Sequence, residues 1–380
     1  MPPPFVPRAE AQNRNLATLI RGEIAEAGGW ISFSRYMELA LYHPRLGYYR
    51  ARRPKFGVGG DFVTAPEVSS LFGRTLARQV ARVLELTGGD VLELGAGSGK
   101  LALDLIRELD GLNAAPSRYF ILELSAELAT QQLELLSSQS GDTKVEWLSR
   151  LPETFTGIVL ANEVLDALPV NVVAWRREGL FERGVAVSPE GEFEWRERTL
   201  TDPELARAAV SLDLEPEYVS EIGLRARALT RALSAMLQRG ALILIDYGFG
   251  QREYYHPQRS RGTLMCHYRH RAHEDPFYLP GLQDITSHVD FSAIAEAGID
   301  SGLALLGYTT QAQFLVNCGI TRLLEQTPPD NIREYLPLAT AVHKLVSPAE
   351  MGELIKVIAL GRGIEGPLLG FAQGEKSRLL

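Results

Sequence analysis

Short apolar runs alternate with amphipathic helical stretches through the middle of the chain. Runs at 119–124, 157–164 and 240–248, and the run that ends at Leu94, predict buried strands, and 144–148 predicts a weaker one. The stretches after the first two strands, 100–109 and 125–138, have the apolar spacing of helices. Strands that alternate with helices are typical of an α/β fold with a doubly wound, mostly parallel sheet. A late apolar run at 354–363 predicts one further strand of that sheet.

Two regions interrupt this alternation. Residues 170–200 alternate apolar and polar positions with a period of two, and turn-forming residues stand at 178–179 and 189–191. They predict an antiparallel meander inserted after the fourth strand, which we expect to wall a substrate cleft. Residues 311–350 have a mostly helical pattern, with a break at Pro328-Pro329.

The first part of the chain predicts a segment that packs over the binding site. Residues 16–27 have the pattern of a short amphipathic helix that ends at Gly28-Gly29. The segment Thr64-Ala-Pro-Glu67 has the spacing of a capping box for a helix that continues to about residue 88. We therefore expect four parts: a cap segment at 1–75, a sheet domain at 76–310 with an insertion at 170–225, a helical insertion at 311–350, and a final strand and tail at 351–380.

The composition narrows the class of protein. The 380 residues carry a net charge of −8, with 45% hydrophobic and 23% charged residues, which is ordinary for a soluble globular protein. An acidic chain is a poor non-specific binder of nucleic acid, because phosphates require basic patches. Two cysteines cannot form a disulfide framework, and no window approaches the ~18 apolar residues of a membrane span. These features predict a cytoplasmic protein with no nucleic-acid partner and no membrane span.

A glycine-rich turn, Glu93-Leu-Gly95-Ala-Gly97-Ser-Gly99, stands between a predicted strand and a predicted helix. Glycines there allow positive φ and a close approach of the backbone to a ligand. The spacing G-x-G-x-G differs from the dinucleotide fingerprint and from a phosphate loop. An acid two residues before the first glycine can take the cationic amino group of a methionine moiety, and Glu123 at the end of the next strand can bond both ribose hydroxyls. Together they favour S-adenosylmethionine over NAD; the alternative is a tight turn without a ligand.

Two acids and an amide interrupt the apolar stretch at 158–170: Asn162, Glu163 and Asp166. Buried charges are costly without partners, and ligands of a doubly wound sheet bind beyond the carboxyl ends of its strands. If the loop begins a helical turn, Glu163 and Asp166 share one face. Two carboxylates can hold an arginine guanidinium, which is always charged. We therefore expect both acids to be catalytic; the alternatives are a loop acid paired with a neighbouring arginine, or Asp166 as a helix cap.

The glycine-rich turn and the acids belong to a longer series of motifs. Between residues 15 and 365 the chain contains, in this order, LYHPRLGYY, GDFVTAPEVSSLFG, VLELGAGSGKLALDLI, ANEVLDALPV, ILIDYG, GTLMCHYRHRAHEDP and DITSHVDF. In this series the chain resembles the MidA family of class I methyltransferases, which includes the mitochondrial arginine methyltransferase that assists complex I assembly. Ser69-Ser70 departs from the Ser-Gln that the family usually has. The resemblance implies a Rossmann-like fold, S-adenosyl-L-methionine as cofactor and, as in the mitochondrial members, symmetric dimethylation of a protein arginine.

The resemblance also implies roles for residues outside the glycine-rich turn. Beside the cofactor we expect Leu124, Asn162, Thr64 and Pro66, and beside the substrate Asp61, Glu67, His270 and His288. The two histidines can equally be structural. Cys266 with the histidines at 267, 270 and 273 suggests a metal, but this spacing fits one helical face only approximately, so we expect no metal site.

The partner that these features imply is a protein with a target arginine, and a respiratory-complex subunit is one candidate; a homodimer is left open. Two other functions are also compatible with the sequence. A non-catalytic assembly factor that binds the cofactor would need no acidic pair, and a small-molecule methyltransferase could use the same fold. A nucleic-acid methyltransferase fits less well because Asn-Glu-Val-Leu replaces the N-P-P-[YF] signature. A nicotinamide dehydrogenase fits least, because of the glycine spacing.

Overall fold

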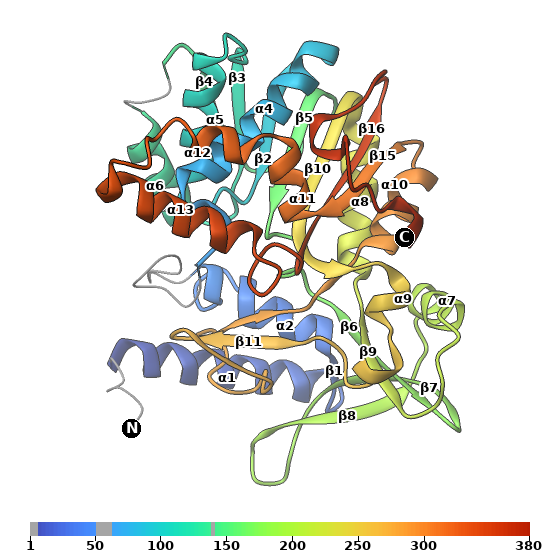
Figure 1. Cartoon of the computed structure of the whole chain (residues 1–380). Coiled ribbons are helices and arrows are strands. Elements are labelled where there is room, and N and C mark those ends of the chain that lie inside the picture. The colour runs from blue at the N-terminus through green and yellow to red at the C-terminus, as the bar shows by residue number, and fades with distance from the viewer. Residues whose placement is uncertain (1–6, 51–62, 138–140) are drawn as a thin grey trace.

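The computed structural model describes residues 7–50, 63–137 and 141–380 (Figure 1). A large sheet with helices on both faces forms the upper part of the molecule in this view. A smaller unit below it combines the N-terminal helices, the segment after the fourth large-sheet strand and a hairpin arm. Within the described ranges, no helix combines the length and apolar character needed to cross a bilayer.

The main sheet has the predicted doubly wound architecture. Its order is β15 (Ala304–Thr310), β16 (Ile355–Arg362), β10 (Leu237–Phe249), β5 (Phe155–Asn162), β2 (Asp90–Leu94), β3 (Arg118–Leu122) and β4 (Lys144–Leu148). The strands from β10 to β4 are parallel, whereas β16 and β15 run antiparallel to their neighbours. The short strand β14 (Val289–Asp290) pairs in parallel with the last residues of β10. The late strand predicted at 354–363 is confirmed, but β15 was not foreseen.

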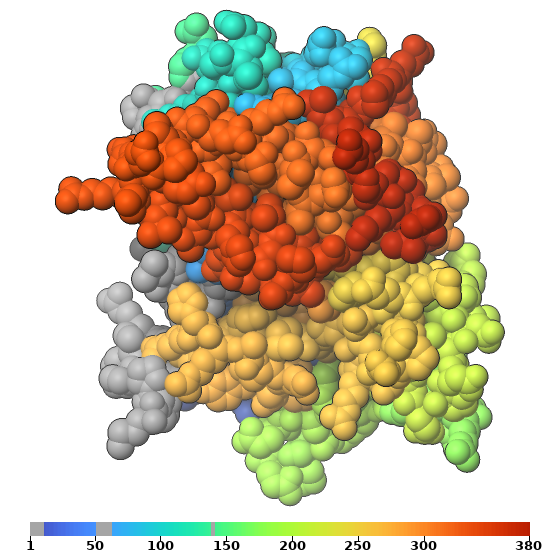
Figure 2. Space-filling view, in the orientation of Figure 1, coloured from blue at the N-terminus to red at the C-terminus, as the bar shows by residue number. Residues whose placement is uncertain are grey.

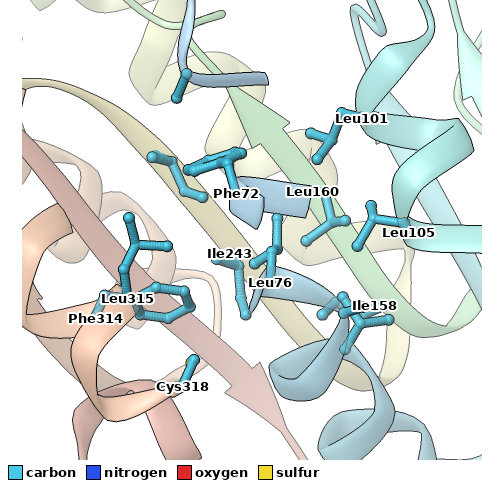
Figure 3. Close-up of a cluster of buried hydrophobic side chains, with 14 of the residues drawn as sticks. Phe72, Leu76, Leu101, Leu105, Ile158, Leu160, Ile243, Phe314, Leu315 and Cys318 are labelled. Carbon is cyan, nitrogen blue, oxygen red and sulfur yellow. The ribbon is translucent and has the colours of Figure 1, made fainter. Parts of the chain in front are cut away.

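Helices cover both faces of this sheet. On one face lie α4 (Ser70–Thr87), α5 (Lys100–Gly111), α6 (Ala126–Leu136), α11 (Gln311–Asn317), α12 (Ile320–Leu324) and α13 (Ile332–Val346); on the other lie α8 (Leu224–Met236) and α10 (Phe291–Asp300). Figure 3 shows side chains of α4, α5 and α11 packed on β5 and β10, with Leu76 beside Ile243 and Leu105 beside Leu160. The central strands are buried on both faces, which explains why they appear in the sequence as unbroken apolar runs.

The helical pattern at 311–350 is confirmed. The helices α12 and α13 are separated at Pro328-Pro329, as predicted. In Figure 2 the orange and red surface of the segment from α11 onward covers the front of the sheet. The chain also contains short elements: α7 (Pro203–Ser211), which packs beside β6 and β9, and α9 (Gln251–Tyr254), η2 (Pro257–Arg259), η3 (Leu369–Phe371) and η4 (Ser377–Leu379).

The smaller unit contains the predicted meander. The strands β6 (Asn171–Arg176), β7 (Gly179–Val187) and β8 (Phe193–Thr199) pair antiparallel in succession, and β9 (Tyr218–Ile222) and β1 (Ile31–Ser32) complete their sheet. The helices α1 (Pro7–Glu26) and α2 (Phe33–Tyr42) pack with it, as does the arm β11 (Met265–Tyr268), β12 (Arg271–His273) and β13 (Asp284–Thr286). The first helix therefore begins earlier than residue 16, where the prediction placed it.

The predicted capping box is wrong. Thr64 precedes α3 (Ala65–Val68), but its side chain makes no capping hydrogen bond. The backbone is extended at Ser69, where φ is −165°, and the Ser69 side chain caps the next helix by accepting a hydrogen bond from the Leu71 N–H. Two helices therefore replace the one predicted, because the extended backbone at Ser69 interrupts the helix. The second helix, α4, also spans the predicted limit between residues 75 and 76.

Candidate cofactor and substrate site

A cavity of about 570 Å³ opens at the carboxyl ends of β2, β3 and β5. The chain winds outward from β2 to β4 and then returns to place β5 on the other side of β2, so the strand order reverses between β2 and β5. This reversal is where doubly wound sheets bind ligands. The walls are completed by α2, by η1 (Tyr48–Arg50) and α3, and by α8.

The glycine-rich turn forms the floor of this cavity. Gly95, Gly97 and Gly99 have φ of 62°, 54° and 82°, in the left-handed region that favours glycine, and α5 begins at Lys100. A Cβ on Gly95 would lie 3.3 Å from Val164 Cγ2, so the turn is also closely packed against the loop after β5. The backbone therefore faces the cavity without side chains, as close contact with a ligand requires.

Glu93 lies beside this turn and lines the cavity, with only 2% of its surface exposed. Its Oε2 accepts a 2.6 Å hydrogen bond from the Tyr119 hydroxyl. Burial raises the pKa of Glu93 to about 7, with a further rise from the charge of Glu123, and the Tyr119 hydrogen bond opposes both. A buried carboxyl that is costly to ionise alone is well suited to a cationic partner.

Glu123 lies across the turn from Glu93 and also lines the cavity. The Ser125 N–H donates to its Oε1 over 2.8 Å, and Gln132 Nε2 donates to its Oε2 over 3.1 Å. The same Gln132 nitrogen donates to the Gly97 carbonyl over 2.9 Å, and Gln132 Oε1 accepts from Trp147 Nε1. Gln132 is fully buried and holds the glycine-rich turn and Glu123 together. The sequence prediction missed it, although its place between Leu128 and Leu136 on the apolar helix face was a usable signal.

The segment from α3 closes the cavity from the N-terminal side. Thr64 and Pro66 line the cavity, as does the half-exposed Leu124 from the β3–α6 loop. Glu67 also lines it, but its carboxylate accepts a 2.5 Å hydrogen bond from Ser98 Oγ and pairs with Lys100 Nζ at 2.5 Å. Its charge therefore ties α3 to the glycine-rich turn, so it is poorly placed for the predicted role in substrate binding.

The loop after β5 places Glu163 at the cavity in an unusual backbone conformation. Its φ is 52°, which is uncommon for a residue other than glycine, and its N–H donates to the Ile245 carbonyl over 2.8 Å. Its Oε1 accepts hydrogen bonds from the Ala65 N–H and from Asn162 Nδ2, over 3.1 and 3.2 Å. Burial raises the pKa of Glu163 to about 8, the charge of Asp246 adds to the rise, and the two hydrogen bonds reduce it. Glu163 therefore gains or loses a proton close to neutral pH.

Asp166 does not share the cavity with Glu163. It is 9% exposed and is absent from the cavity lining. Burial raises its pKa well above the usual range, and the charges of neighbouring carboxylates add to the rise. The prediction that both acids share a face required a helical turn starting at Glu163. The left-handed conformation of Glu163 prevents such a turn, so the two side chains separate.

The histidines expected beside the substrate lie elsewhere. His270 is exposed in the β11–β12 turn, where its φ is 59°, and His288 packs against the rings of Tyr247 and Phe249. Burial lowers the pKa of His288 to about 4, so it stays neutral. Neither lines the cavity. Asp61, the other expected contact, falls outside the described residues.

The meander does not wall the cavity as predicted. No lining residue in the described part of the chain comes from 171–200. The wall is instead made by Glu38 and Tyr42 of α2 and by Arg225 and Leu229 of α8. The meander packs behind α2 through Val172 and Val185, so it supports the wall without reaching the ligand space. Within the described ranges no three His, Cys, Asp or Glu side chains are grouped to hold a metal ion.

The side chains around the cavity fit S-adenosyl-L-methionine. Three glycines leave the backbone open, Glu93 can face the cationic amino group, and Glu123 can face the ribose. Asn162 adds a specific indication, because its buried Oδ1 has no hydrogen-bond partner within the protein. Such an acceptor is costly unless a ligand or water supplies a donor.

Comparisons with known proteins agree with this geometry. Residues 75–309 match a family model described as "putative S-adenosyl-L-methionine-dependent methyltransferase". A protein of Burkholderia thailandensis, whose crystal structure holds S-adenosyl-homocysteine, is 52% identical over the full length of both chains, with a TM-score of 0.96. The mitochondrial protein arginine methyltransferase NDUFAF7 of Danio rerio is 30% identical, covering 86% of this chain and 82% of its own. The human protein of that name is 27% identical, covering 87% and 80%.

These relatives overturn the predicted location. The chain was expected to be cytoplasmic, but the curated relatives from fish, fly and human are all named as mitochondrial proteins. The prediction failed because a low cysteine count indicates a reducing compartment without saying which one.

Proposed function

The chain belongs to a family of S-adenosyl-L-methionine-dependent methyltransferases, its cofactor is S-adenosyl-L-methionine, and we propose that the methyl acceptor is an arginine side chain of a protein. The observation that carries this proposal is the carboxylate of Glu163, held at the cavity by Ala65 and Asn162. The names of the curated relatives support the same acceptor. A respiratory-complex subunit is one client to test.

The charge of the cavity favours a cationic acceptor. Among its described lining residues are five glutamates and two arginines. Two of these, Glu38 and Arg225, are well exposed at their side chains and lie 3.8 Å apart, so they mark an edge where the cavity meets solvent. An arginine side chain could enter there, because its aliphatic stem suits the apolar wall and its guanidinium suits the acids beyond.

Glu163 has two tasks in this reaction. When bound, S-adenosyl-L-methionine supplies a methyl group on a sulfonium, and the bond from carbon to sulfur breaks as the new bond to nitrogen forms. Glu163 first holds the guanidinium through charge-assisted hydrogen bonds. The nitrogen that gains the methyl group must lose one proton, and a carboxylate whose pKa lies at about 8 in the free protein can accept it. Glu93, Glu123, Asn162 and the glycine-rich turn bind the cofactor in this proposal.

The proposal is tested by finding what becomes methylated. The purified protein, S-adenosyl-L-methionine with a labelled methyl group, and lysate from a strain lacking the protein are incubated together. We expect label in protein, and methylarginine after complete hydrolysis. A Gly97→Val protein supplies the inactive control. Label found only in small molecules, or only on other amino acids, would refute the arginine acceptor, and absence of all transfer would favour an assembly factor.

A further inference from the structure

Asp246, the residue of β10 that follows the last pair with β5, organises the loop that carries Glu163. Its side chain is 1% exposed. One oxygen, Oδ2, accepts hydrogen bonds from the N–H groups of Val164, Leu165 and Asp166, over 3.1, 2.8 and 3.3 Å. The other, Oδ1, accepts from the Tyr247 N–H over 2.8 Å. A single carboxylate therefore satisfies three consecutive donors of the loop.

These donors need a partner because the loop leaves the sheet at this point. Pairing between β5 and β10 ends at Asn162 and Ile245, and the Glu163 N–H makes the last bond to the backbone of β10. A residue other than glycine in the left-handed region costs of order 1–3 kcal/mol and persists only where the surroundings impose it. The structure around Glu163 imposes it from both sides, through the Ile245 carbonyl before the loop turns and through Asp246 after it.

We propose that Asp246 is a positioning residue for methyl transfer, which holds the backbone of 164–166 so that Glu163 presents its carboxylate to the cavity. Asp246 is absent from the cavity lining, so it acts through the loop and not on a ligand. The inference rests on the proposed role of Glu163 as the residue that holds the methyl acceptor.

Asp246 also changes the electrostatics that Glu163 experiences. Among the described residues, the charged and titratable groups that face Glu163 are Asp246 and Tyr247 from β10 and Asp166 from its own loop, while the Ala65 N–H of α3 donates a hydrogen bond to it. The negative charge of Asp246 raises the pKa of Glu163. Removal of that charge lowers the pKa, so Glu163 becomes a carboxylate at a lower pH.

Two substitutions separate the effects of shape and charge. Asp246→Asn keeps an oxygen that can accept the loop N–H groups but removes the charge, whereas Asp246→Ala removes both. The control is Asp290→Asn, since Asp290 is another buried carboxyl that accepts two consecutive N–H groups, those of Ser292 and Ala293, but at α10 and away from the cavity. Three quantities are measured. The first is total methyl transfer to lysate protein, expressed as kcat and as KM for S-adenosyl-L-methionine. The other two are the affinity for S-adenosyl-homocysteine and Tm.

For Asp246→Ala we expect kcat to fall by about tenfold or more, as for loss of one charged hydrogen bond, with little change in S-adenosyl-homocysteine affinity. For Asp246→Asn we expect partial activity, with the acid limb of the kcat profile moved to lower pH. Asp290→Asn should leave kcat and its pH profile unchanged and change Tm little, because asparagine caps a helix about as well as aspartate. Wild-type kcat in a folded Asp246→Ala protein would overturn the inference. If that protein does not fold, an Asp246→Asn pH profile identical to wild type would overturn it instead.

The test of Asp246 gives a result that does not depend on which residue accepts the methyl group. The Asp246 variants are compared with wild type by total label transferred, whichever residue receives it. The identity of the labelled residue is determined on the wild-type product alone. Label on a residue other than arginine would therefore refute the arginine acceptor while the effect of Asp246 on transfer could still be measured.

Discussion

Replacement of Glu163 by glutamine tests the proposed reaction most directly. Glutamine retains the size of the side chain and an oxygen that can accept the hydrogen bonds of the Ala65 N–H and Asn162 Nδ2. It cannot carry a negative charge or take a proton. The change therefore removes the chemistry assigned to Glu163 while it keeps the local contacts.

The expected loss of activity follows from the bond that Glu163 would make. A hydrogen bond to a charged group contributes ~1.5–3 kcal/mol. Because ~1.4 kcal/mol corresponds to a factor of ten in rate, we expect Glu163→Gln to slow methyl transfer at least about tenfold. S-adenosyl-homocysteine affinity should change little, since Glu93 and Glu123 remain in place. Asp166→Asn should have a milder effect, because Asp166 is absent from the cavity lining.

The stability of the same variant should change in the opposite direction. The pKa of Glu163 rises from an ordinary 4.5 to about 8 on folding, so the folded protein holds this proton more tightly than the unfolded chain. The resulting stabilisation is complete below about pH 4.5 and is lost as the pH rises through about 8. Glutamine resembles the protonated form and avoids this loss. At about 1.4 kcal/mol per pKa unit, the stability that wild type loses at high pH has an upper limit of roughly 5 kcal/mol. Partial exposure of Glu163 and the shared charge of Asp246 reduce the expected difference between the two proteins to about 1–2 kcal/mol.

The assay combines three measurements on wild type and Glu163→Gln. Methyl transfer is followed with labelled cofactor at saturating substrate, ligand affinity by calorimetry, and Tm from pH 5 to about pH 9, a range that contains the folded-state pKa. We expect slow transfer, wild-type affinity, and a Tm that exceeds that of wild type only at the upper end of the range. Full transfer in a folded variant would refute the role of Glu163, and a Tm below wild type at every pH would show that its charge serves the fold.

Three further predictions concern the cofactor site and the sheet. Gly97→Val should abolish binding of S-adenosyl-homocysteine measured by calorimetry, because φ is 54° and the side chain would enter the ligand space; unchanged affinity in a folded protein would contradict this. Tyr119→Phe removes the hydrogen bond that lowers the pKa of Glu93. The affinity for S-adenosyl-homocysteine should therefore weaken below about pH 8 and recover above that pH. A loss of affinity that is the same at every pH would be evidence against this role of Glu93. Gly240→Ala should lower the free energy of unfolding by at least ~3 kcal/mol in denaturant titration, because its Cβ would lie 1.8 Å from a carbonyl oxygen of β5. Gly22→Ala in α1, which meets nothing within 4 Å, is the matched control and should be neutral or slightly stabilising.

Much of the main sheet and of the cofactor site could be predicted because the relevant signals are local. A strand buried on both faces must be apolar throughout, so the runs that became β2, β3, β5 and β10 were visible without a structure. A turn with positive φ at three positions requires glycine. An acid two residues before such a turn must lie at the end of the same strand. The cofactor followed from these constraints.

The inner structure of the site depended on contacts between distant segments. Gln132 bonds Gly97 across 35 residues, and Asp246 bonds the loop N–H groups across about 80. Neither pairing leaves a periodic pattern, because each depends on the order of strands in the sheet.

The part of the site that would bind the substrate was also only partly predictable from the sequence. The sequence by itself determined the sheet, the glycine-rich turn and the presence of acids after β5. Only the tertiary structure decided that Glu163 faces the cavity while Asp166 does not, and that α2 and α8 form the wall instead of the meander. The physical reason is that spacing along a chain predicts a shared face only where the backbone is regular. At Glu163 the backbone turns left-handed, and bonds from the neighbouring strand set the direction of the side chain.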